Sequence, residues 1–99
     1  MTLNEIANRG PQPFSIIARE EFGRLPRALT KEVWDSIQEK DKKKAKEIEA
    51  YKTMALWEYD QGSPLKFGVA LHKMIDRVLN FMTYWDERER IEAGVVIES

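Results

Sequence analysis

Residues 63–94 read SPLKFGVALHKMIDRVLNFMTYWDERERIEAG, the longest uninterrupted helical pattern in the chain. Ser63 can accept a hydrogen bond from a first-turn N–H, and Pro64 suits the first helical position because its missing N–H needs no partner there. Gly94 supplies a stop signal. The apolar residues follow the spacing that gathers them on one side of a helix: Phe67, Leu71, Met74, Ile75, Val78, Phe81, Met82 and Trp85. The stretch predicts a helix over 64–93, about 45 Å long.

A second helix is expected directly before this one. Its apolar stripe contains Ala45, Ile48, Tyr51 and Ala55. Met54, Leu56, Trp57 and Tyr59 extend the apolar surface around most of its last turns, so that end requires cover on several sides. Because the connection Gln61-Gly62-Ser63 is short, the helices at about 42–61 and 64–93 should form an antiparallel hairpin.

The start of the second helix leaves two interpretations open. Val33, Trp34 and Ile37 give residues 31–39 an apolar edge, but residues 39–44 are polar on every face. Either one helix spans 31–61 with a solvated middle, or a short helix ends near Glu39 and Asp41 caps a new one. We favour the break at Asp41.

Residues 1–30 carry signals for short helices. Thr2 and Glu5 form a capping box ahead of a helix over residues 3–8. A second unit spans 13–22, where helical spacing is favoured over a strand at 14–18. The sequence thus predicts one all-α domain over 1–99, with short helices in 1–30 packed across a hairpin built from 31–61 and 64–93. The tail at 95–99 can fold back, pair as an edge strand or dock on a partner.

Composition narrows the function classes. The chain has 99 residues, of which 42% are hydrophobic and 33% charged, with a net charge of −1. The absence of cysteine excludes disulfides, thiolate metal sites and cysteine nucleophiles. No secretion signal or membrane-length apolar run is visible, so we expect a cytoplasmic protein in a reducing compartment, without membrane contact.

Candidates for catalysis or metal binding are sparse. His72, the only histidine, lies one helical turn before Asp76, and this spacing is typical of a local hydrogen bond or charge pair; a metal site would need a third ligand. Carboxylate pairs occur at Glu32 and Asp35 and at Glu89 and Glu92, but their order and separation differ from those of all-helical nucleotide pyrophosphatases. We therefore expect no enzyme, no catalytic or metal-ligating residues, no cofactor and no small-molecule substrate.

The lysines of residues 40–46 support an alternative function. Lys42, Lys43, Lys44 and Lys46 could contact nucleic-acid phosphates if 30–46 formed two short helices around a turn. Glu39, Asp41, Glu47 and Glu49 are interleaved with them and weaken the local positive field. A small DNA- or RNA-binding regulator is therefore the second choice.

Aromatic residues are crowded into the predicted hairpin. Seven of the ten aromatics lie between Tyr51 and Trp85, and the single seam between two helices cannot bury them all. Either residues 1–37 cover the surplus, or an exposed aromatic patch forms an interface with another protein or another copy. We favour the interface, with Trp57, Tyr59, Phe81, Tyr84 and Trp85 as its residues.

Residues 28–51 read ALTKEVWDSIQEKDKKKAKEIEAY. This stretch resembles segments of small helical accessory and tail-assembly proteins of tailed bacteriophages, in which a Trp-bearing helical turn precedes a charged stretch and an aromatic residue. The resemblance implies a role in building or modifying a larger assembly. Our primary prediction remains a non-enzymatic interaction, assembly or regulatory subunit, with a bacteriophage accessory or virion protein as a further alternative.

Overall fold

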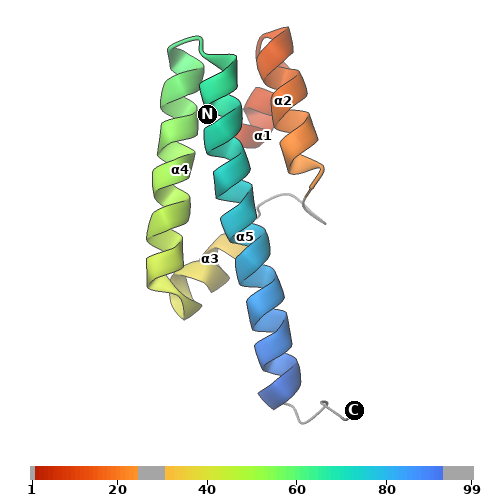
Figure 1. The fold of residues 1–99 in the computed structure, drawn as a ribbon, viewed down its shortest axis with the longest axis vertical. Helices are drawn as coiled ribbons and strands as arrows, with labels where there is room; N and C mark the ends of the chain where they lie inside the picture. Colours follow the sequence, from red (N-terminus) through yellow and green to blue (C-terminus); the bar gives the residue numbers. More distant parts are fainter. Residues whose placement is uncertain (1, 25–30, 93–99) are drawn as a thin grey trace.

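The computed structural model describes residues 2–24 and 31–92, without the side chains of residues 89–92. Within these ranges the chain forms five α-helices and no strand (Figure 1), which confirms the all-α prediction. The helices are α1 (Leu3–Arg9), α2 (Gln12–Phe22), α3 (Lys31–Lys40), α4 (Lys42–Asp60) and α5 (Pro64–Glu92). The expected stop at Gly94 and the tail at 95–99 lie outside the described residues.

Helices α4 and α5 form the predicted antiparallel hairpin and run side by side in Figure 1. The turn is set by Gly62, whose φ of 75° is a left-handed conformation that glycine adopts without a Cβ penalty. The Ser63 amide donates to the Glu58 carbonyl and the Gly62 amide to the Tyr59 carbonyl, each at 3.0 Å. These bonds satisfy the last carbonyls of α4 and reverse the chain within three residues.

The predicted break between 31–39 and the next helix is confirmed at Asp41. The Asp41 carboxylate accepts a hydrogen bond from the Lys44 amide at 3.0 Å, which caps the first turn of α4. Helix α3 ends at Lys40 and contacts α4, and its Ile37 is fully buried. A continuous helix would have left this polar stretch without a packed face, whereas the break lets α3 fold back.

Helix α1 begins with the predicted capping box, in which the Glu5 amide donates to Thr2 Oγ1 at 3.1 Å. Its Leu3, Ile6 and Ala7 are buried. Helix α2 connects the N-terminal unit to the hairpin through Phe14, whose ring lies 4.6 Å from that of Tyr59 and 5.3 Å from that of Phe67. One aromatic cluster therefore ties α2, α4 and α5 together.

Close approach of α2 to α5 depends on Gly68. A Cβ at Gly68 would lie 3.1 Å from Ile17 Cγ2, tighter than an ordinary van der Waals contact. The N-terminal helices thus pack on the side of the hairpin that carries Gly68 and Tyr59. The molecule is elongated, with extents of 50 × 23 × 20 Å. None of its described helices is both long and apolar enough to span a membrane.

Candidate functional site

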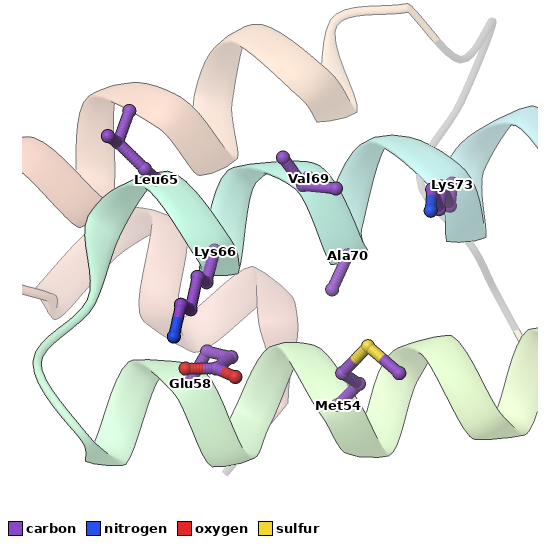
Figure 2. A pocket seen from close by; sticks show the side chains of 7 residues that line it. All are labelled: Met54, Glu58, Leu65, Lys66, Val69, Ala70 and Lys73. Atoms are coloured by element: carbon purple, nitrogen blue, oxygen red, sulfur yellow. The ribbon is translucent and has the colours of Figure 1, made fainter.

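A groove between α4 and α5, which we call the hairpin groove, has a largely apolar lining. It has a volume of about 400 Å³ and is lined by residues of these two helices alone (Figure 2): Met54, Glu58, Leu65, Lys66, Val69, Ala70 and Lys73. On α5, Lys66 and Lys73 project roughly 140–160° around the helix from Gly68, which faces α2, and Val69 about 100°; Leu65, at about 60°, is still 84% exposed. The hairpin groove therefore lies on a side of the hairpin that the N-terminal helices leave uncovered.

Large apolar side chains are exposed along this groove. Leu65 is 84% exposed, Val69 56% and Met54 47%, whereas Ala70 is buried and forms the floor. A few scattered apolar residues on a surface need no explanation, but three around one hollow form a contiguous patch. Such a patch is typical of a surface that another molecule covers.

Charged residues border the apolar patch. Lys66 and Lys73 lie on the α5 side, two helical turns or about 10 Å apart, and Glu58 lies on the α4 side. Figure 2 shows the Lys66 side chain extending toward Glu58 across the groove. Further along α5, the charged groups of Lys73 and Arg77 lie 5.8 and 5.1 Å from the ring centre of Tyr51 on α4. These contacts orient both cations along the same side of α5.

A second hollow of about 410 Å³ continues the surface toward the other end of the hairpin. It is lined by Asp41, Lys44, Asn80, Phe81 and Tyr84. Lys66 and Tyr84 are five full helical turns apart and therefore project in the same direction from α5. We call the surface that contains both hollows the open face of the hairpin.

The five predicted interface residues differ in how exposed their side chains are. Trp57 and Tyr84 are each 51% exposed, in agreement with an exposed aromatic surface. Phe81 is 5% exposed, and Tyr59 is half-buried against Phe14 and Phe67. Trp85 is also half-buried, beneath Lys40 and Arg88 at 5.6 and 5.7 Å. Phe81 and Tyr59 therefore belong to the packed interior and not to the predicted patch.

The remaining aromatics do not meet in one patch. Tyr84 lies beside Lys44, and Trp57 is thirteen residues further along α4, a separation of about 20 Å. The exposed apolar side chains around the hairpin groove are instead Met54, Val69 and Leu65, which the sequence prediction did not select. A usable signal existed, because Leu65 and Val69 are apolar but fall outside the buried stripe of α5.

The four lysines of the nucleic-acid alternative lie on the first turns of α4. Lys42, Lys43 and Lys46 are exposed, and Lys44 forms an ion pair with Glu47 at 3.7 Å. Only Asp41 separates α3 from α4, whereas a helix-turn-helix motif has a turn of roughly three to four residues. Nucleic-acid binding by these lysines remains a prediction without a recognisable motif.

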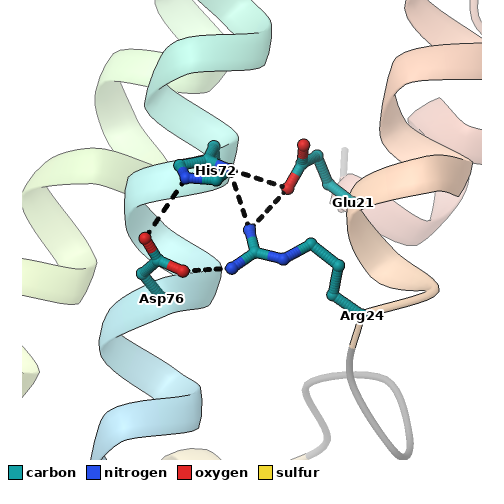
Figure 3. Close-up of polar contacts among 4 residues, drawn as sticks. All are labelled: Glu21, Arg24, His72 and Asp76. Atoms are coloured by element: carbon teal, nitrogen blue, oxygen red, sulfur yellow. Dashed lines mark hydrogen bonds and ion pairs between the residues drawn. The ribbon is translucent and has the colours of Figure 1, made fainter.

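His72 and Asp76 belong to a polar cluster that joins α5 to α2 (Figure 3). Arg24 bonds to Glu21 and Asp76, and its Nη1 lies 2.9 Å from His72 Nδ1. His72 Nε2 lies 3.3 Å from Asp76 Oδ2, the local pair that the spacing predicted. The hydrogen bonds that Arg24 donates to Glu21 and then to Asp76 raise the pKa of Arg24 above its ordinary value, so the guanidinium stays charged. The cluster fastens the end of α2 to the hairpin.

The carboxylate pairs provide no assembled site in the described region. Asp35 is exposed and pairs with Lys31 at 3.0 Å. The side chains of Glu89 and Glu92 lie outside the described residues. Among the residues whose side chains are described, no three of His, Cys, Asp or Glu are grouped so that they could hold a metal ion.

Comparisons with known proteins give no relative for this chain. No protein-family model, curated protein or solved structure matches it. The role implied by the resemblance of residues 28–51 to bacteriophage assembly proteins therefore remains a prediction.

Proposed function

We propose that this chain is a non-enzymatic interaction or assembly subunit that binds a protein partner through the open face of its α4–α5 hairpin. The observation that carries the proposal is the hairpin groove, where Leu65, Val69 and Met54 are exposed around one hollow. Burying such side chains releases about 25 cal/mol per Å² of apolar surface, so a partner that covers them gains affinity.

The packing of the helices supports the proposal. Helix α2 packs on the side of the hairpin that carries Gly68, whereas residues of α4 and α5 alone line the hairpin groove. A partner on the open face would complete the enclosure that helix bundles normally achieve.

Affinity capture with matched variants tests the proposal. The tagged chain is incubated with an extract of cells that produce the untagged chain, so that both other proteins and other copies are available. Leu65→Asp and Val69→Asp place a carboxylate in the apolar patch at exposed positions, where the helix itself should tolerate it. Gln38→Asp adds the same charge on exposed α3 and is the control.

We expect a polypeptide that the native chain and Gln38→Asp retain and that Leu65→Asp and Val69→Asp lose. The loss should reach tenfold or about 1.4 kcal/mol, because a buried carboxylate without a partner opposes binding. Capture that is equal for all four proteins, or no capture at all, would contradict the proposal.

A further inference from the structure

We propose that the partner on the open face is a second copy of this chain, and that two hairpins pack together as a four-helix bundle. This inference rests on the proposed function and specifies its partner. In the bundle, α4 of each copy lies against α5 of the other. The order of charged and apolar residues along the two helices supports this arrangement.

The two stripes that border the open face have the same spacing but opposite charge. On α4 the stripe contains Glu47, Ala50, Met54 and Glu58, and on α5 it contains Lys66, Val69, Lys73 and Arg77. Both follow steps of three, four and four residues, which keep side chains on one side of a helix. Each stripe is charged at its ends; the interior of the α4 stripe is apolar, whereas the interior of the α5 stripe contains Val69 and the charged Lys73.

The register of the hairpin aligns these stripes. Glu58 and Lys66 line the same end of the hairpin groove. Arg77 lies over the ring of Tyr51, which is one turn from Glu47 on α4. Since the helices are antiparallel, Glu58 is level with Lys66 and Glu47 is level with Arg77. Each acidic residue therefore has a basic residue at its own height on the neighbouring helix.

A twofold axis along the hairpin makes this arrangement self-complementary. Such an axis exchanges α4 with α5 and preserves height, so Glu58 faces Lys66 of the second copy and Glu47 faces its Arg77. A twofold axis across the hairpin would place α5 against α5 and bring Lys66, Lys73 and Arg77 toward like charges. Electrostatic complementarity therefore selects the first arrangement.

The available area predicts a weak dimer. The open face extends from the level of Asp41 to that of Asp60, about 28 Å, and two adjacent helices are about 20 Å wide. The two copies together would bury about 1,100 Å², near the lower limit for a specific interface. We expect a dissociation constant on the order of 10–100 μM.

Sedimentation equilibrium of the full chain tests the inference, from about 5 μM to about 500 μM. The mass of the native chain should rise from 11.6 kDa toward twice that value, and Val69→Asp should keep it at 11.6 kDa. Glu58→Lys and Lys66→Glu should each weaken the dimer at least about tenfold by placing like charges opposite one another. The double variant Glu58→Lys/Lys66→Glu should restore the dimer, while Gln38→Asp should leave it unchanged.

Three results would overturn the inference: a monomer at every concentration, a dimer that persists in Val69→Asp, or a double variant that stays as weak as the single ones. Circular dichroism of each variant establishes that the helices are retained. A monomeric chain whose capture of another protein still depends on Leu65 and Val69 would reject the second copy as partner and leave the proposed function standing.

Discussion

Gly10 occupies a position where the fold leaves no room for a side chain. A Cβ there would lie 2.8 Å from the Ile6 carbonyl oxygen and 3.0 Å from Tyr59 Oη. Its φ of −68° and ψ of 168° suit any L-residue, so the requirement for glycine comes from packing and not from backbone conformation. The contact sets how closely the end of α1 approaches α4.

We therefore predict that Gly10→Ala lowers the free energy of unfolding by about 1–3 kcal/mol, because α1 or Tyr59 must move to admit the methyl group. Urea unfolding followed by circular dichroism measures the loss. Gly23→Ala is the matched control, since its Cβ would meet nothing closer than 3.3 Å and its backbone is already helical. Equal losses in the two variants would contradict this account of Gly10.

The burial and packing partners of the individual aromatic side chains could not be predicted from their positions in the sequence. Their abundance near the hairpin predicted an exposed aromatic patch; Trp57 and Tyr84 are exposed, but they lie apart on the hairpin. Helical spacing alone could not show that Tyr59 would meet Phe14, because that contact depends on where α2 packs. Helical spacing could not predict the burial of Trp85 either. Its indole N–H is buried without a hydrogen-bond partner among the described residues.

Helix boundaries were predictable because they depend on local chemistry. The capping box at Thr2, the cap at Asp41 and the turn at Gly62 are each set by residues within one helical turn. Helix α2 begins at Gln12, one residue before the expected start, with Pro13 in its first turn. The side of the hairpin that the N-terminal helices would cover was not predictable, since Gly68 opposite Ile17 decides it through a tertiary contact.

The cap at Asp41 separates α3 from α4, and its removal should weaken that junction. We predict that Asp41→Ala lowers the free energy of unfolding by about 0.5–2 kcal/mol, because the Lys44 amide loses its acceptor and three lysines remain at the positive end of the helix dipole. Asp41→Asn keeps an acceptor and should cost less than half as much. Urea unfolding compares the two, and equal stability of the alanine variant and the native chain would contradict the capping role.

At the scale of the whole molecule, the chain is more extended than its length requires. Its radius of gyration is 15.2 Å, whereas a compact domain of 99 residues has about 12.6 Å. The long helix α5 extends beyond the region that α1 and α2 cover. The partner is placed on the open face because Leu65, Val69 and Met54 are exposed there around one hollow.

The most direct test of the open face is to map where the chain meets another copy. Amide ¹H–¹⁵N spectra recorded between about 20 μM and about 1 mM would show concentration-dependent shifts or broadening at interface residues. We predict that these changes cluster at Glu47, Met54 and Glu58 on α4 and at Lys66, Val69 and Lys73 on α5, with α1 and α2 unaffected. Spectra that do not change, or changes centred on α1 to α3, would contradict the account.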